Sequence, residues 1–279
     1  MPTAQPAGSA DLDRQALIAA AKGAALCTIV GIDGSFSRPV GAQLAIRADG
    51  SIAGSLSDGC LERQLASDSR SLGVAALRRY GTGSPVIDFR LPCGGGLDIL
   101  IDPAPDVPAC RAALLALEQR RPARLPLPAN ALLAERIYLP ALAVRAFGEG
   151  PELAAFADIA AAAGIAVTAI DKSALALGQA SGLAPADPWT AIVLLFHDHE
   201  WEIALLREAL AEDAFYIGAQ GGAQARRARI ETLRAAGIDK DDLARVRSPI
   251  GTPPGSRSPQ ALALAVLAEI TAAYEALRG

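Results

Sequence analysis

The C-terminal half of the chain alternates short apolar runs with segments of helical spacing, and this alternation limits the fold more than any other feature. Apolar runs at residues 141–147 and 191–196 each lead into a helical pattern, with a further apolar run at 165–170 between them. Strands that alternate with helices form a parallel sheet covered by helices on both faces. We therefore expect residues 141–279 to form an α/β, Rossmann-like domain with a parallel sheet, whose ligands bind at the carboxyl ends of the strands.

The N-terminal part, residues 1–119, is richer in glycine and in short strand patterns. The Asp49-Gly50 pair predicts a hairpin, because this dipeptide adopts the tight turn that joins antiparallel strands. With helical spacing on both sides, the pattern predicts an α+β domain. The expected helices are residues 11–22, 61–77 and 108–119, and the expected strands are 25–31, 43–47, 51–55, 86–90 and 97–101. Residues 120–140 begin with a proline-rich stretch and are expected to form a linker.

Composition excludes several classes of protein. Of the 279 residues 51% are hydrophobic, which supports a buried core and excludes intrinsic disorder. A net charge of −4 and an aromatic content of 4% argue against a nucleic-acid or membrane-surface partner. We find no membrane span and no secretory signal at the N-terminus. Four cysteines are too few for a disulfide framework in a chain of this length, so a cytoplasmic location is expected.

Two of these cysteines lie in turns where a thiol can be reactive. Ser57 or Asp58 can cap the helix that follows, which places Cys60 in its first turn, where the helix dipole favours the thiolate. Cys93 precedes Gly94 and Gly95 in a stretch of high backbone freedom that exposes the sulfur and admits a bulky ligand. The alternatives are a small buried residue at the first position and an incidental cysteine in a flexible loop at the second.

Glycines also mark the first turn of the C-terminal domain. Gly148 and Gly150 lie between the first apolar run and a helical pattern, where a phosphate can approach the helix N-terminus. Asp171 follows the next strand, where a carboxylate can accept a hydrogen bond from a ribose hydroxyl. A plain turn without a nucleotide is the alternative, because the third glycine of the usual fingerprint is absent.

Two further segments of this domain carry polar chemistry. His197 and His199 follow the third apolar run, at a position where such sheets bind ligands. A metal site there lacks a third ligand, and a simple helix-capping turn is the alternative. Arg226 belongs to a cluster with Arg227 and Arg229 behind a glycine-rich loop, and arginine binds phosphate with two parallel hydrogen bonds. A solvated basic face is the alternative.

Several of these segments, in this order, resemble the XdhC/CoxI-type accessory proteins of xanthine dehydrogenase and related molybdenum hydroxylases. The resemblance extends from about residue 12 to 275. The segments are 34–42 (GSFSRPVGA), 54–62 (GSLSDGCLE), 91–96 (LPCGGG), 197–200 (HDHE), 216–218 (YIG), 226–237 and 248–251 (SPIG) with the Ser258-Pro259 pair.

The resemblance implies a chaperone that binds molybdenum cofactor, as molybdopterin or its dinucleotide form. It implies that the cofactor is held while its metal gains a terminal sulfido ligand from a cysteine desulfurase, and is then inserted into an apo molybdenum hydroxylase. No substrate turnover is implied. A homodimer is expected on general grounds.

From the residues, we hypothesise that Cys60 and Cys93 bind the metal end of the cofactor, because soft thiolates suit such a metal. The C-terminal domain would hold the phosphate end, or the nucleotide of a dinucleotide form, across a cleft between the domains. Two alternatives stay open. One is an NAD(P)-dependent oxidoreductase that uses Gly148, Gly150 and Asp171. The other is a scaffold that brings hydroxylase and desulfurase together without using its thiols.

Overall fold

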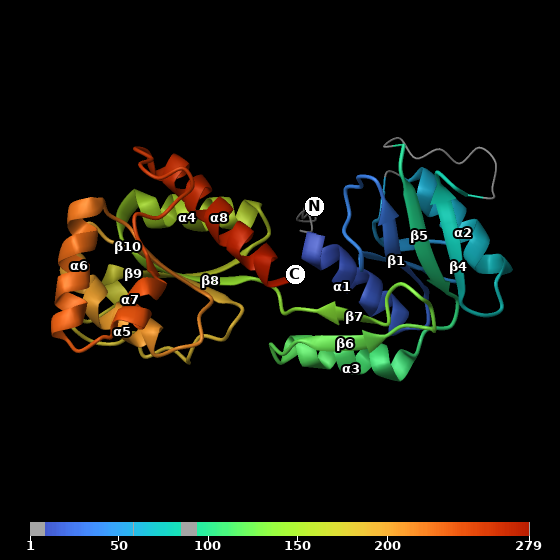
Figure 1. Cartoon of the computed structure of the whole chain (residues 1–279). Coiled ribbons are helices and arrows are strands. Elements are labelled where there is room, and N and C mark those ends of the chain that lie inside the picture. The colour runs from blue at the N-terminus through green and yellow to red at the C-terminus, as the bar shows by residue number, and fades with distance from the viewer. Residues whose placement is uncertain (1–8, 58, 85–93, 279) are drawn as a thin grey trace, which may run out of the picture. The chain divides into compact units, whose positions relative to one another are not determined.

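Figure 1 shows a computed structural model of the chain, which describes residues 9–57, 59–84 and 94–278. The chain divides into two compact units, one ending at Ala141 and the other running from Leu142 to Gly279. We call them the first and the second unit and describe each by itself. Within the described residues, no helix is long and apolar enough to cross a membrane.

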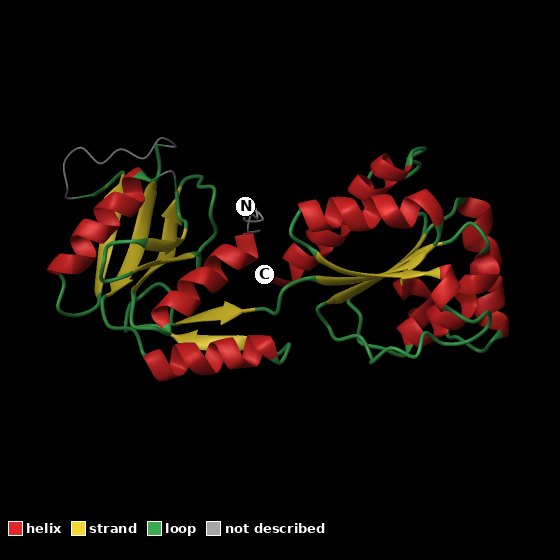
Figure 2. Ribbon diagram, turned by 180° about the vertical axis from the view of Figure 1, so that it is seen from behind, coloured by secondary structure: helices red, strands yellow, loops and turns green. Residues whose placement is uncertain are grey.

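The first unit is built on an antiparallel sheet whose strand order among the described residues is β3-β2-β1-β5-β4. Alternate residues of its strands point to opposite faces, so that Leu26 packs with the helices α1 and α3, and Cys27 packs with α2. Figure 2 shows this sheet with its helices. The elements are α1 (Ser9–Ala20), β1 (Ala25–Asp33), β2 (Gln43–Ile46), β3 (Ile52–Gly54), α2 (Cys60–Ser71), β4 (Ala76–Gly81), β5 (Gly96–Asp102) and α3 (Val107–Glu118).

Strand β4 is the main departure from the expected first-unit elements. The helical spacing of residues 61–77 predicts one helix, but α2 ends at Ser71 and β4 begins at Ala76, after four intervening residues. Leu72 is already extended, with φ −97° and ψ 129°, and Gly73 follows it, so the helix stops where glycine makes it least stable. In the sheet, β4 pairs with β5. The strand expected at 86–90 lies outside the described residues.

The segment expected to be a linker contains an antiparallel ribbon of β6 (Ala123–Pro126) and β7 (Glu135–Tyr138). Buried side chains of both strands join the core that α1 and α3 form. Tyr138 donates a hydrogen bond to the buried side chain of Gln43, and Arg136 forms an ion pair with Asp13 at 2.9 Å. The prolines did not prevent this pairing because a two-stranded ribbon consists only of edge strands, where proline is tolerated. Residues 120–140 therefore pack as part of the first unit.

The second unit confirms the expected α/β fold with a parallel sheet. Its strand order among the described residues is β12-β11-β10-β8-β9, and each neighbouring pair is parallel. Helices α4 and α8 pack on one face, and α5, α6 and α7 pack on the other. The elements are β8 (Ala143–Gly148), α4 (Gly150–Ala162), β9 (Ala166–Asp171), η1 (Lys172–Ala174), β10 (Thr190–Leu195), η2 (His199–Trp201), α5 (Glu202–Leu210), β11 (Tyr216–Ala219), α6 (Ala223–Ala235), α7 (Lys240–Arg245), β12 (Val246–Arg247), α8 (Pro259–Glu275) and η3 (Ala276–Arg278).

The strand order also places the ligand-binding edge of this sheet. The chain runs from β8 outward to β9 and then returns to β10 on the other side of β8, so the direction of winding reverses between β8 and β10. In open α/β sheets, ligands bind where this reversal separates the loops at the carboxyl ends of the strands. The residues that follow Gly148 and Leu195 therefore border the expected position.

Tyr138→Phe tests whether the ribbon is part of the first unit. The change removes the hydroxyl that donates to Gln43, which is fully buried, and leaves its carbonyl oxygen without that donor. We expect the free energy of unfolding to fall by about 1–3 kcal/mol. Urea unfolding measures the loss, and Ile137→Thr, at an exposed position of the same strand, is the control. An unchanged stability would show that the ribbon does not support the unit.

Candidate functional site

Three segments that carry the family resemblance converge at one end of the first-unit sheet. In the β1–β5 pairing Asp33 lies opposite Gly96, so the loop that begins at Gly34 adjoins residues 94–96. Strand β4 ends opposite Gly96 as well. Because only four residues join α2 to β4, the two run in opposite directions, and α2 begins at this same end (Figures 1 and 2). We call it the glycine end of the sheet.

Cys60 is the first residue of α2, and its side chain is exposed. The structure thus places it in the first helical turn, as the sequence predicts, but the N-cap is Gly59. Gly59 has a φ of +99°, a conformation that favours glycine. The guanidinium of Arg63 donates a hydrogen bond to the Sγ atom of Cys60 at 3.1 Å. An exposed sulfur beside a cation is accessible to a ligand in solution.

The cap of this helix comes from Glu62, a residue that the sequence analysis missed. Its side chain is 5% exposed and accepts hydrogen bonds from the N–H groups of Leu56 at 3.1 Å, Ser57 at 2.5 Å and Gly59 at 2.7 Å. The last of these is half of a capping box, in which the third residue of a helix reaches back to its N-cap. A glutamate three residues after Gly59 was the available signal.

Residues 94–96 are held closely against neighbouring strands. Gly94 has a φ of +70°, and a methyl group at Gly95 would lie 2.5 Å from the carbonyl oxygen of Asp33. A methyl group at Gly96 would overlap the guanidinium of Arg79, which forms ion pairs with Asp33 at 2.9 Å and with Asp98 at 2.7 Å. The expected backbone freedom therefore applies to Gly94, while Gly95 and Gly96 permit close packing. Cys93 lies outside the described residues.

Cys27 and Cys110 are both buried in the core of the first unit. Burial raises the pKa of the Cys27 thiol strongly, and the nearby carboxylate of Asp68 adds to this effect. Burial, together with the nearby carboxylate of Asp106, raises the pKa of Cys110 to about 11. Both side chains are therefore uncharged thiols at neutral pH, unsuited to binding a metal.

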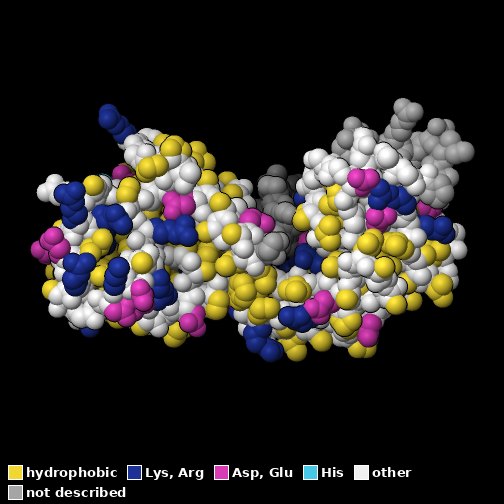
Figure 3. Space-filling model, in the orientation of Figure 1, with side chains coloured by type: hydrophobic (Ala, Val, Ile, Leu, Met, Phe, Trp, Pro, Cys, Tyr) yellow, Lys and Arg dark blue, Asp and Glu magenta, His cyan; other side chains and the backbone are white. Residues whose placement is uncertain are grey.

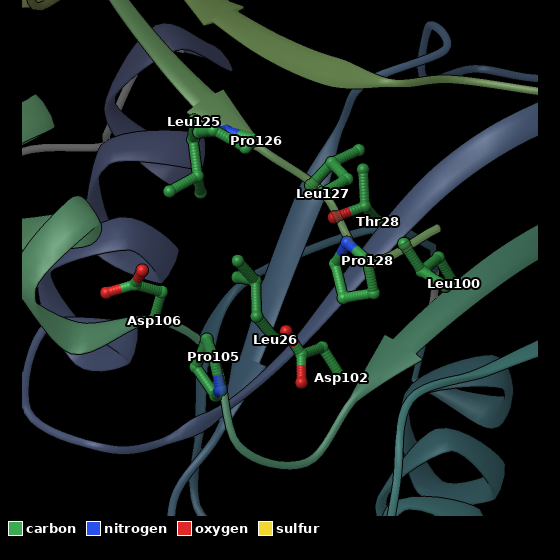
Figure 4. A pocket seen from close by; sticks show the side chains of 10 residues that line it. All are labelled: Leu26, Thr28, Leu100, Asp102, Pro105, Asp106, Leu125, Pro126, Leu127 and Pro128. Carbon is green, nitrogen blue, oxygen red and sulfur yellow. The ribbon is translucent and has the colours of Figure 1, made fainter. Parts of the chain in front are cut away.

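A small hollow lies at the opposite end of the same sheet (Figure 4). Leu26 and Asp102, which line it, face each other at the far end of the β1–β5 pairing from Asp33 and Gly96. Apolar residues and prolines make up most of its wall. Burial raises the pKa of Asp102, and its carboxylate accepts from the N–H of Ala104. The hollow is thus separate from the glycine end.

In the second unit, the predicted residues do gather at the carboxyl edge of the sheet. Gly148 lies opposite Asp171 in the β8–β9 pairing and opposite Leu195 in the β8–β10 pairing. Leu195 in turn lies two residues before His197. A methyl group at Gly148 would lie 2.6 Å from the carbonyl oxygen of Leu195, which explains the glycine by packing alone. Gly150 has a φ of +68° at the start of α4.

The charges at this edge do not fit a pyrophosphate at the start of α4. Glu149 is the N-cap and Glu152 lies in the first turn, and these carboxylates pair with Lys172 at 3.2 Å and with His197 at 3.3 Å. The carboxylate of Asp171 caps the turn that follows it, and hydrogen bonds from Ser173 lower its pKa. Two carboxylates thus lie at a helix start that a dinucleotide-binding domain leaves open for an anion.

The arginines after β11 divide into two kinds. Arg229 is buried and donates to Glu202 and to the carbonyl oxygen of Gln220, each at 2.7 Å, and to Ser248 at 2.9 Å. It therefore ties α6 to α5 and to the loops after β11 and β12, so this residue lies neither on a solvated basic face nor free to bind a phosphate. Helical spacing could have indicated this burial, because Arg229 lies four residues before the buried Leu233 and so on the same face of α6.

Arg226 is exposed in the first turn of α6, and no acidic residue lies in that turn. Lys and Arg side chains gather on the surface over the α6 side of the second unit (Figure 3). The carboxylate of Glu202, fully buried, lies 3.2 Å from His199, and burial raises its pKa against the opposing effect of Arg229. By the charges in its first turn, the start of α6 suits an anion better than the start of α4.

Across the described parts of the two units, no three His, Cys, Asp or Glu side chains are grouped so that they could hold a metal ion. The candidate metal ligands remain Cys60, which is exposed, and Cys93, which lies outside the described residues. Two thiolates offer an incomplete set, as is suitable for a metal that already carries ligands of its own.

Comparison with known proteins agrees with this arrangement. Residues 17–81 match the XdhC and CoxI family, and residues 144–270 match the XdhC Rossmann domain. The chain is 34% identical over 268 residues to the molybdenum cofactor insertion chaperone PaoD of Escherichia coli K12, covering 89% of this chain and 83% of that protein. A crystal structure described as a xanthine dehydrogenase from Bacillus halodurans has a TM-score of 0.70 at 16% identity, covering 95% of this chain and 96% of that one. That likeness concerns the fold.

Gly95→Ala tests the close approach at the glycine end. The added methyl group would press on a backbone oxygen, which cannot rotate away, so we expect the free energy of unfolding to fall by about 1–3 kcal/mol. Gly73→Ala is the matched control, because nothing lies within 4 Å of the added methyl group there. Chemical denaturation measures both variants. Equal stability of the two would mean that Gly95 does not pack against Asp33.

Titration with NAD and NADP tests the charge argument in the second unit. Repulsion from Glu149 and Glu152 at the start of α4 should hold the dissociation constant of the wild-type protein above about 1 mM. The double variant Glu149→Gln/Glu152→Gln should bind more tightly, and Glu231→Gln, on the exposed side of α6, should not. Isothermal titration calorimetry measures all three. Micromolar binding by the wild type would contradict the expectation and revive the oxidoreductase alternative.

Proposed function

Because the chain belongs to the XdhC and CoxI family, we propose that it is a chaperone that binds molybdenum cofactor and delivers it to a molybdenum hydroxylase. The relative that is 34% identical is a molybdenum cofactor insertion chaperone. The observation that carries the proposal is the exposed thiol of Cys60 at the glycine end, where three segments distant in sequence converge. The cofactor is cargo here, held and released rather than used for turnover.

The metal end of the cargo is assigned to Cys60 and Cys93. Thiolate is a soft ligand and suits a metal that a dithiolene already holds. Cys60 is accessible from solvent, and the guanidinium of Arg63 adds a donor beside its sulfur. Gly94 and Gly95 follow Cys93 without side chains, which leaves room for the flat pterin beside the backbone.

The phosphate end of the cargo, or the nucleotide of a dinucleotide form, is assigned to the second unit. Arg226 supports this assignment because it is exposed in the first turn of α6, a turn that holds no acidic residue. His197 is exposed at the carboxyl edge and can donate to a phosphate, although Glu152 competes for it. Candidates for contacts with the sugar of a nucleotide remain Gly148, Gly150 and Asp171. The carboxylate of Asp171 can accept a hydrogen bond from a sugar hydroxyl, whereas it would repel a phosphate.

The finer steps rest on the resemblance. We propose that the cargo is held while a cysteine desulfurase supplies the terminal sulfido ligand, and that the receiving partner is an apo-hydroxylase of the xanthine dehydrogenase type. The protein is proposed to act as a homodimer. An exposed thiol at the metal end would leave the metal within reach of both partners.

Cysteine variants test the role of the thiols in the protein purified from cells able to make the cofactor. We expect Cys60→Ala and Cys93→Ala each to lower bound molybdenum and molybdopterin about tenfold, because loss of one ligand bond costs of the order of 1.4 kcal/mol or more. Metal analysis and the fluorescence of oxidised pterin measure the occupancy. Cys110→Ala is the control, since this thiol is buried away from solvent. Wild-type occupancy in both variants would defeat the thiolate role and favour the scaffold alternative.

A further inference from the structure

We propose that Glu62 is a positioning residue: its carboxylate fills the anion-binding turn ahead of α2 and so presents Cys60 to the cargo, while the turn itself binds no phosphate. That Glu62 serves cargo binding rests on the proposed function. That its carboxylate occupies the turn follows from the hydrogen bonds alone. A glycine-containing loop that enters a helix can offer its free N–H groups to an external anion. Here the anion belongs to the chain.

The contacts show how completely the turn is occupied. Oxygen Oε1 of Glu62 accepts from the N–H groups of Leu56 at 3.1 Å and Ser57 at 2.5 Å, and from the hydroxyl of Ser55 at 3.5 Å. Oxygen Oε2 accepts from the N–H of Gly59 at 2.7 Å. Both carboxylate oxygens are therefore engaged by donors of the preceding turn. Bonds of N–H groups to a carboxylate are stronger than those between neutral groups.

Because the carboxylate of Glu62 is buried, breaking its hydrogen bonds would leave buried polar groups unpaired and so cost free energy. Glu62 is 5% exposed, and among the described residues it meets backbone and hydroxyl donors instead of a cation. The dipole of α2 favours a negative charge at this position in its first turn. Leu56, whose N–H is bound by Glu62, has a fully buried side chain in the core under α2. The carboxylate thus ties the turn to the core at one side and to the helix at the other.

The consequence concerns what a ligand meets at this end of the sheet. The N–H groups of Leu56, Ser57 and Gly59 point to Glu62, so they are not available to a phosphate. Beside the turn lie the exposed sulfur of Cys60 and the guanidinium of Arg63, which are 3.1 Å apart. A ligand that reaches the start of α2 therefore meets the sulfur, while the three N–H groups that Glu62 engages are closed to it.

Glu62→Gln is the primary test. Glutamine keeps the volume but places an NH2 group against the N–H donors of the turn, so exchange of the amide hydrogens of Leu56, Ser57 and Gly59 should accelerate about tenfold. Amide NMR measures the exchange, and Cys60-dependent molybdopterin occupancy should fall about tenfold in the same variant. Glu118→Gln, at the exposed end of α3, is the matched control. Unchanged exchange in Glu62→Gln would overturn the proposal.

Two further experiments distinguish a positioning role of Glu62 from a role in folding stability alone. In Glu62→Ala, formate should enter the vacated turn and restore both amide protection and molybdopterin occupancy, which a loss of folding would not permit. In the wild-type protein, inorganic phosphate should leave the amide signals of Leu56, Ser57 and Gly59 unshifted. Shifts at these amides would overturn the proposal even if Glu62→Ala does not fold. Wild-type protein without molybdopterin would defeat the proposed function alone, since the exchange and phosphate arms need no cargo.

Discussion

The antiparallel pairing of β1 with β5 decides where the chemistry of the first unit can lie. The two strands are more than sixty residues apart in sequence, and their register sets Asp33 opposite Gly96. That register needs two positions without side chains, because Gly95 packs on the backbone of Asp33 and Gly96 lies under Arg79. With β4 paired to the other side of β5 and joined to α2 by a short turn, Cys60 is brought to the same end. A shift in this one pairing would separate the segments that the family shares.

Both units contain a glycine turn at a helix start, and in both the chain supplies carboxylates to it. In the first unit Glu62 is buried and engages the turn fully. In the second, Glu149 and Glu152 lie at the start of α4 and pair with Lys172 and His197. A glycine turn alone therefore does not indicate phosphate binding, because the sign of the nearby charge decides whether an anion is attracted.

Local patterns predicted much of the fold and part of the site. The alternation after residue 141 predicted the parallel sheet, and strand-end positions placed Gly148 and Asp171 side by side. Glu62 and Arg229 were missed because their roles depend on partners that the sequence does not announce: backbone N–H groups of a turn in one case, and a buried carboxylate 27 residues away in the other. The ribbon at 123–138 was missed because proline content predicts a break without showing whether the chain pairs with itself.

By itself, the sequence determined the kinds of element, the division into an α+β and an α/β part, and the position of Cys60 in the first turn of a helix. These follow from interactions between residues close in the chain, namely side-chain period, turn preference and helix capping. Only the tertiary structure decided which turns remain open to a ligand. That outcome depends on burial and on charges that folding brings in from elsewhere, and an acidic residue read from the sequence does not show whether it faces water or fills a turn.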